Sequence, residues 1–144
     1  MNTEAPVTGT TAYLLDAGPL AAAVNRRDQH HAWAVRTLDR LDAPALTCEA
    51  VVSEAWFLAR RGRGDPAGLL DLVAALDVRV VSAWRPRTDA ILRRYADRAS
   101  VADASLLALA EESDGHVVVT TDREDFSVYR LGRRRAVPAL APPP

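Results

Sequence analysis

The sequence has no lysine, and all 18 basic residues among its 144 residues are arginine. This absence removes every mechanism that needs a lysine amine. A Walker-type phosphate loop requires a lysine on the phosphates, and Schiff-base chemistry requires a lysine nucleophile. Receiver domains and haloacid-dehalogenase-type phosphatases also depend on a lysine. Several phosphate-handling α/β families are therefore disfavoured.

Cysteine and long apolar runs are equally scarce. The lone Cys48 cannot form an intramolecular disulfide or a cysteine zinc cluster, and its apolar neighbours predict a small buried side chain. No apolar run approaches the roughly 20 residues that span a bilayer. The segment Met1–Thr11 is polar and lacks the basic-then-apolar order of a signal peptide. We therefore expect a cytoplasmic protein without a membrane partner.

Charged residues of both signs are mixed along the chain. The net charge is -1, so charge alone gives no hint of a nucleic-acid partner. The length fits one domain, because a domain usually has roughly 100–200 residues. We predict a flexible N-terminus at residues 1–11, one domain at 12–140 and a proline-rich tail at 141–144, since Thr, Gly and Pro give both ends little to bury.

Short apolar runs alternate with helical patterns between these ends. The three valines after His116 are the clearest strand signal, and Pro19 is expected to open a helix at its favoured first position. Continuous apolar strands separated by helices predict an α/β fold, in which helices cover both faces of a mostly parallel sheet. The predicted strands are 13–15, 45–48, 78–81 and 116–120, and the other predicted helices are 30–41, 50–61, 66–76, 86–95 and 100–112.

Two aspartates directly follow predicted strands. Asp16 comes after the strand at 13–15, and Asp122 comes soon after the strand at 116–120. Open α/β sheets bind ligands beyond the carboxyl ends of their strands, so both side chains are candidates for a functional site. The alternative for each is an ordinary turn aspartate.

Two further carboxylates fall on apolar helix faces. Glu54 shares a face with Val51 and Leu58, and a carboxylate there is costly unless it is paired or binds a cation. Its alternative is a position at the edge of the stripe with its tip in water. Asp103 has the spacing of a capping box with Ser100. It could both cap its helix and contribute a carboxylate to a functional site.

A cluster of such carboxylates predicts a divalent cation. Two unit charges about 5 Å apart repel by roughly 3 kcal/mol at an effective dielectric of about 20. Oxygen ligands without a set of His or Cys favour Mg²⁺ or Mn²⁺ over Zn²⁺. Such ions polarise a phosphodiester and lower the pKa of an attacking water, so phosphodiester hydrolysis fits. Asp125 is either a fifth acid or the cap of a short turn that packs Phe126 inward.

Four motifs occur in the order found in PIN-domain nucleases. They are Leu14–Leu20 (LLDAGPL), Val51–Glu54 (VVSE), Val101–Ala110 (VADASLLALA) and Thr120–Phe126 (TTDREDF). The first two are weak alone, whereas the helix and the last turn are more specific. Over about residues 12–137 the chain resembles this family, and its size and spacing resemble VapC-type toxins. The resemblance implies a three-layer PIN-like fold with a central sheet of four to five strands.

The resemblance also implies roles for individual residues. Asp16, Glu54, Asp103 and Asp122 would be catalytic metal ligands, with Asp125 as a supporting ligand. It further implies cleavage of RNA with Mg²⁺, or Mn²⁺ as a substitute, homodimerisation, and inhibition by a small cognate antitoxin. The sequence departs from the family at Ala17, where a Thr or Ser hydroxyl is frequent, so Thr120 or Thr121 is expected to supply that hydroxyl.

The RNA itself must be held by positive charge near the acidic residues, and the arginine fork suits phosphate. The candidates are Arg60, Arg61 and Arg63 after the Glu54 helix, Arg123 beside Asp122, and the hydroxyl of Thr121; Trp56 is a candidate for a subunit or antitoxin contact, and Arg133–Arg135 for a solvated edge. Two other functions remain open from sequence. One is a PIN nuclease of RNA processing without an antitoxin, and the other is a binding module without catalysis.

Overall fold

A central sheet of five parallel strands organises the protein, which the computed structural model describes over residues 9–144. The strand order is β3-β2-β1-β4-β7. The strands are β1 (Ala12–Leu15), β2 (Ala45–Cys48), β3 (Arg79–Val81), β4 (His116–Val119) and β7 (Ala139–Leu140). The predicted α/β fold with a mostly parallel sheet is confirmed. Of the predicted flexible N-terminus, residues 1–8 lie outside the described part of the chain.

All of β1 and the three valines of β4 are buried because helices cover both faces of the sheet. Every residue of β1 is buried, and β4 pairs with it in the register Leu14↔Val118. Cys48, at the end of β2, is 2% exposed, as its apolar context predicted. The edge strand β3 is much more exposed, with Val80 at 44%.

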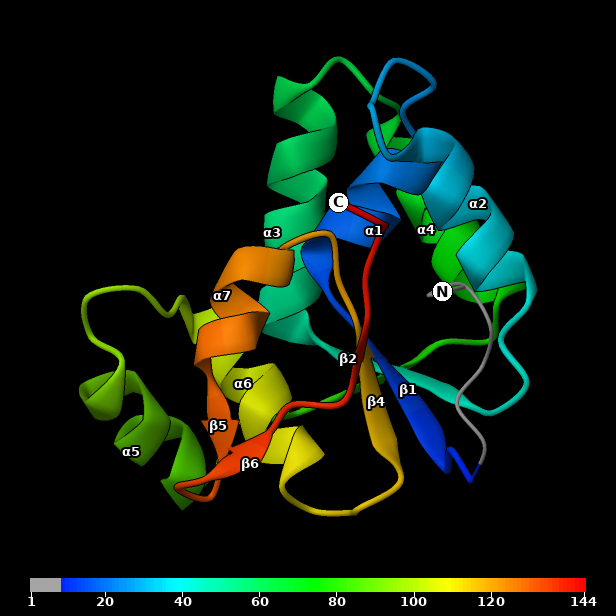
Figure 1. Ribbon diagram of the computed structural model, residues 1–144. Helices are drawn as coiled ribbons and strands as arrows, with labels where there is room; N and C mark the ends of the chain where they lie inside the picture. Colours follow the sequence, from blue (N-terminus) through cyan, green and yellow to red (C-terminus); the bar gives the residue numbers. More distant parts are fainter. Residues whose placement is uncertain (1–8) are drawn as a thin grey trace.

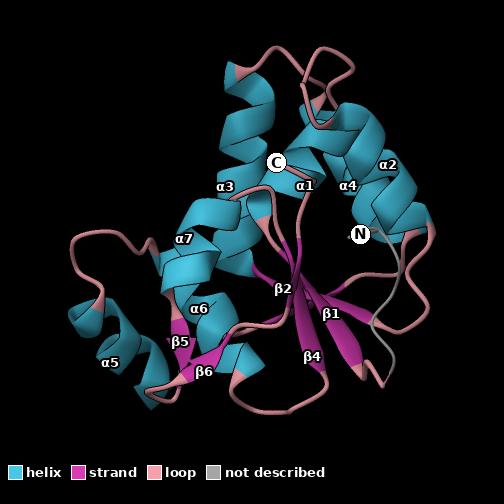
Figure 2. Ribbon diagram, viewed as in Figure 1, coloured by secondary structure: helices cyan, strands magenta, loops and turns pink. Residues whose placement is uncertain are grey.

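Helices lie on both sides of this sheet (Figure 2). They are α1 (Ala17–Ala23), α2 (His31–Asp39), α3 (Glu49–Arg61), α4 (Pro66–Ala75), α5 (Pro86–Arg94), α6 (Val101–Ala110) and α7 (Arg123–Val128). Figure 2 shows α5 and α6 on one side of the sheet and α2 and α4 on the other. The almost wholly buried α6 packs on β1, β2 and β4. None of the helices within residues 9–144 is both long and apolar enough to cross a membrane.

The first helix begins earlier than the sequence predicted. We expected Pro19 to occupy the first helical position, but α1 begins at Ala17 with Asp16 as its N-cap. Aspartate is a strong N-cap residue because its carboxylate accepts from the free N–H groups of the first turn. Pro19 is tolerated because those N–H groups have no partner within the helix.

The C-terminal part of the chain differs most from the prediction. A two-stranded antiparallel hairpin, β5 (Arg130–Leu131) and β6 (Arg135–Ala136), precedes β7. Within the proline-rich tail, Ala141 and Pro142 are buried rather than frayed. The Arg123 guanidinium donates to the Pro142 carbonyl at 2.7 Å and thereby ties the tail to the start of α7.

Candidate functional site

The site is built at the carboxyl ends of β1 and β4, where α1 and α7 begin (Figure 1). Asp16 is 5% exposed. One carboxylate oxygen accepts from the Ala17 N–H at 2.8 Å, and the other accepts from the Thr120 hydroxyl at 2.7 Å. Thr120 thus supplies the hydroxyl that the sequence lacks at Ala17. The side chain of Asp16 is fixed from both sides.

Asp103 enters the site from the first turn of α6. The Ser100 hydroxyl caps this helix by accepting from the Asp103 N–H at 3.0 Å. The Asp103 carboxylate accepts from the Tyr129 hydroxyl at 2.6 Å, a buried contact across 26 residues of sequence. Asp103 therefore takes part in the capped first turn of α6 through its N–H and in a buried contact through its carboxylate. Tyr129 was not recognised from the sequence.

Asp122 and Asp125 come from the turn that opens α7. The Asp122 carboxylate caps the helix by accepting from the Asp125 N–H at 2.9 Å, and its own N–H donates to Thr120. Asp125 accepts from the Arg98 guanidinium at 2.7 Å, with both side chains about one third exposed. Asp125 is therefore partly neutralised.

The pKa shifts of the buried carboxylates reflect this grouping. Burial raises the pKa of Asp16 to about 7, and the charges of Asp103 and Glu54 oppose its ionisation further. The pKa of the half-buried Glu54 is raised by burial and by the charges of Asp103 and Asp122. Burial is also the largest cause of the raised pKa of Asp103 and of Asp122, and Asp125 adds to both. These acids interact although they are far apart in sequence.

We call Asp16, Glu54, Asp103 and Asp122, with Asp125 at its margin, the acidic crevice. Within residues 9–144 no group of three or more His, Cys, Asp or Glu side chains is arranged as a ready-made metal site. The donor set nevertheless fits a hard divalent cation, because every candidate ligand atom is a carboxylate oxygen. Burial raises the pKa of Asp16, Glu54, Asp103 and Asp122, and neighbouring carboxylates raise it further, so a bound cation would offset the cost of ionising them.

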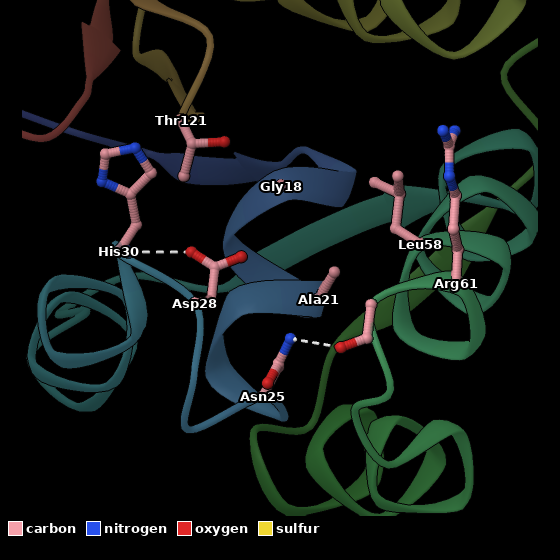
Figure 3. A pocket seen from close by; sticks show the side chains of 9 residues that line it. Gly18, Ala21, Asn25, Asp28, His30, Leu58, Arg61 and Thr121 are labelled. Atoms are coloured by element: carbon pink, nitrogen blue, oxygen red, sulfur yellow. Dashed lines mark hydrogen bonds between the residues drawn. The ribbon is translucent and has the colours of Figure 1, made fainter.

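The predicted RNA-binding residues do not all lie together. Arg61 and Thr121 line one pocket beside the acidic crevice (Figure 3). Arg60 is exposed on α3. Arg123 differs from the expectation, because its guanidinium donates to the carbonyls of Ala141 and Pro142 instead of remaining free for phosphate.

Sequence reasoning missed Tyr129 and Arg98. A buried tyrosine hydroxyl needs a hydrogen-bond partner, and Tyr129 follows the TTDREDF motif by three residues, so a signal existed. That signal did not identify Asp103 as the partner. The contact of Arg98 with Asp125 likewise joins the turn after α5 to α7 and is visible only in the fold.

Comparison with known proteins agrees with this fold. The structure is similar to the crystal structure of Mycobacterium tuberculosis VapC20, described as a sarcin–ricin loop cleaving toxin, with a TM-score of 0.63 and 22% identity over 74% of this chain and 86% of that one. Comparison with curated protein sequences gives no match. A family model described as the PIN domain matches residues 13–131. Because this match spans most of the sequence, the chain belongs to the PIN-domain family.

Proposed function

We propose that this protein is a divalent-metal-dependent endoribonuclease and the toxin of a toxin–antitoxin pair, acting in the cytoplasm. One observation carries the proposal. Asp16, Glu54, Asp103 and Asp122 lie close enough for their charges to act on one another, burial raises the pKa of all four, and none of them forms an ion pair with an arginine in the described part of the chain. A group of buried carboxylates is costly unless a cation balances its negative charge.

Asp16, Glu54, Asp103 and Asp122 would hold Mg²⁺, or Mn²⁺ as a substitute, with Asp125 in support. The bound ion would polarise a phosphodiester and lower the pKa of a water molecule. Thr120 and Tyr129 keep Asp16 and Asp103 in place through hydrogen bonds of 2.7 and 2.6 Å. Partners of this kind orient ligands and keep them available for a metal.

The RNA substrate and the antitoxin are inferred from the likeness to VapC20, which is described as a sarcin–ricin loop cleaving toxin. Charge supports an RNA substrate, because the exposed Arg60 and Arg61 follow Glu54 on α3. Each can offer a phosphate a planar fork of donors.

The protein also presents an apolar face that suits a second copy. Trp56 and Val80 line one hollow, Trp84 and Val101 line the next, and both hollows include Glu49. Trp84 is 61% exposed and Val101 48%. Contiguous exposed apolar side chains mark interaction sites, so we assign this face to a homodimer. A Trp84→Glu variant that sediments as the same dimer as the wild type would contradict this assignment.

The central test is cleavage of single-stranded RNA by the purified chain with Mg²⁺ or Mn²⁺ and with a chelator. We expect cleavage only with the metal, and loss of cleavage in Asp16→Asn. The matched control is Asp114→Asn, because the Asp114 side chain is 95% exposed and outside the acidic crevice. Cleavage by Asp16→Asn at the wild-type rate would contradict the proposal.

Expression in cells separates the toxin from an RNA-processing nuclease. Growth arrest by the wild-type chain but not by Asp16→Asn supports a toxin. Full RNA cleavage without growth arrest would instead indicate a processing enzyme without an antitoxin. A chain that neither cleaves RNA nor shows a Mn²⁺-dependent thermal shift would be a binding module.

A further inference from the structure

A pocket of about 440 Å³ adjoins the acidic crevice, and we call it the side pocket (Figure 3). Its lining includes Ala21, Asp28, His30, Leu58, Arg61 and Thr121. Small-molecule sites commonly have volumes of about 300–1,000 Å³ and mostly apolar walls with a few polar groups. The side pocket has both properties.

The side pocket lies beside the acidic crevice, because α1, α3 and the loop after β4 contribute residues to both. Asp16 caps α1, which lines the side pocket through Gly18 and Ala21. Glu54 lies on α3, and Leu58 and Arg61 follow it at spacings that share one helix face. Thr121 immediately precedes Asp122. A ligand in the side pocket therefore lies next to the carboxylates.

The relative positions of these walls are fixed. A Cβ at Gly18 would collide with the Thr121 hydroxyl where it now lies, so glycine lets α1 approach the loop after β4 without moving this side chain. At the other end, Asn25 joins two segments. Its side chain accepts from the Arg27 N–H at 3.1 Å and donates to the Gly62 carbonyl at 3.1 Å. The side pocket is therefore formed before any ligand arrives.

The polar groups of the side pocket have bonding capacity left. One Asp28 carboxylate oxygen accepts from the His30 N–H at 2.8 Å, as Figure 3 shows, whereas its other oxygen has no hydrogen-bond partner within residues 9–144. The Arg61 guanidinium makes no ion pair in the same part of the chain. The His30 ring faces the pocket beside Thr121 (Figure 3).

We propose that the side pocket binds one unpaired base of the RNA next to the scissile phosphate, and that Asp28 selects guanine. This inference rests on the proposed ribonuclease function. Unpaired RNA bases are recognised by stacking on aromatic rings, histidine included, and by hydrogen bonds at their edges. His30 and Leu58 supply the surfaces for stacking and apolar contact, and Arg61 neutralises a neighbouring phosphate.

Asp28 accounts for the choice of base. An ionised carboxylate only accepts hydrogen bonds. Guanine presents two adjacent N–H donors at its Watson–Crick edge. Uracil presents one donor between two carbonyl oxygens, which a carboxylate repels. Adenine and cytosine each present one amino donor beside an unprotonated ring nitrogen, which a carboxylate repels. Guanine is therefore the base with two adjacent donors, and the free Asp28 oxygen favours it.

The test measures binding of two labelled single-stranded RNAs, one of uracil alone and one with a single guanine, by fluorescence anisotropy. All variants carry Asp16→Asn so that the proposed cleavage is absent. We expect about tenfold tighter binding of the RNA with guanine, since a good base contact discriminates by about 1–3 kcal/mol. In Asp28→Asn this preference should fall below about twofold, because the amide can offer the base a donor in place of an acceptor.

The amide introduced by Asp28→Asn keeps an oxygen for the His30 N–H, so the loop should keep its turn, which a thermal melt verifies. Asp71→Asn removes the same charge from an exposed position on α4 outside the side pocket and should leave the preference unchanged. Equal affinity of the Asp16→Asn chain for the two RNAs would overturn the inference and leave the side pocket to a protein partner. An unchanged preference in Asp28→Asn would overturn it as well.

A second measurement places the base relative to the cut. With Mg²⁺, chains that retain Asp16 should cleave beside guanine, and Asp28→Asn should cleave at dispersed positions. Wild-type cleavage that ignores guanine would overturn the inference while leaving the ribonuclease function intact. Absence of all cleavage would refute the proposed function, and the binding measurement would still decide whether the side pocket distinguishes bases.

Discussion

Carboxylates in two parts of the molecule have opposite surroundings. We call α5, the end of α6 and the β5–β6 hairpin the arginine-rich side. There, Glu111 accepts two hydrogen bonds from Arg87, at 2.8 and 3.2 Å, and one from the Gly132 N–H at 2.9 Å. Burial alone would raise the pKa of Glu111, but these donors lower it below its usual value. In the acidic crevice the pKa of Asp16 is raised instead.

The difference cannot be a shortage of arginine, because the chain has 18. Arg85 pairs with Glu112 at 2.5 Å, Arg93 with Asp89 at 2.9 Å and Arg135 with Asp114 at 2.5 Å. In the crevice, Arg98 contacts only Asp125 at the margin. The fold thus neutralises acids on one side and leaves them unpaired on the other. Unpaired buried acids reduce stability, and such sites occur where function needs the charge.

The largest expected effect is the loss of RNA cleavage in Asp103→Asn, which removes one carboxylate from the acidic crevice. Asp103→Asn removes one negative charge but keeps an oxygen that can accept from Tyr129. Partners that only orient metal ligands contribute about 10–100-fold, so loss of a ligand should lower RNA cleavage by at least about 100-fold. The metal-free chain should remain as stable or become slightly more so, because repulsion is relieved. A large drop in the melting temperature would show that the capping role dominates at this position.

The next effect, on metal affinity, should differ between Tyr129 and Tyr95, whose rings pack edge to face with their centroids 5.0 Å apart. Tyr129→Phe removes the hydroxyl that holds Asp103, so metal affinity and cleavage should fall about 10–100-fold and stability by about 1 kcal/mol. Tyr95→Phe removes a hydroxyl that accepts from the Arg130 N–H at 3.0 Å and, among residues 9–144, bonds to no carboxylate. It should lower stability alone. Equal metal affinity in both variants would refute a positioning role for Tyr129.

The third effect is on the pH dependence of stability. The pKa of Asp16 rises from 3.8, the ordinary value of an exposed aspartate, to about 7 in the folded chain, so the folded chain binds this proton more tightly than the unfolded chain does. The resulting stabilisation is complete below the unfolded value and is lost as the pH rises through about 7. Without metal, the chain should therefore melt several degrees higher at about pH 5.5 than at about pH 8.

Asp16→Asn removes this titration, and its melting temperature should vary less between the two pH values. Asp114→Asn, with an exposed side chain, should follow the wild type. The same proton competes with a cation, so Mn²⁺ affinity of the wild type should increase over this range. A wild-type melting temperature that rises with pH would contradict the assigned shift.

The parts predicted well from sequence are those whose signals are local. Three consecutive valines predicted β4, and the positions of Asp16 and Asp122 after strands predicted the end of the sheet at which they lie. Periodicity placed Glu54 next to Val51 on α3, and it is half-buried at the edge of the inner face, whereas Leu58, expected on the same face, is 37% exposed. Such patterns follow from the pleat of a strand and the turn of a helix, and no partner has to be known.

The parts that sequence missed depend on distant partners. The strand β7 has only two residues, lies between prolines and exists because β4 offers it an edge. The Tyr129 hydroxyl meets Asp103, and the Arg123 guanidinium meets the tail, through contacts between separate elements. The start of α1 is a different kind of error. Asp16 is a local N-cap signal, but the prediction began the helix at Pro19 instead of directly after Asp16.

The smallest expected effect is on the arginine-rich side. Glu111→Gln keeps an acceptor for the Gly132 N–H but removes the charge that pairs with Arg87, whose side chain is 53% exposed. The Glu111 side chain itself is 13% exposed, but solvent reaches the pair through Arg87, and pairs at the surface contribute roughly 0–1 kcal/mol. The melting temperature should therefore fall by a few degrees, and less at high salt. RNA cleavage and Mn²⁺ affinity should remain at wild-type levels, because Glu111 lies outside the acidic crevice. A loss of cleavage as large as that in Asp103→Asn would mean that the two sides do not differ in function.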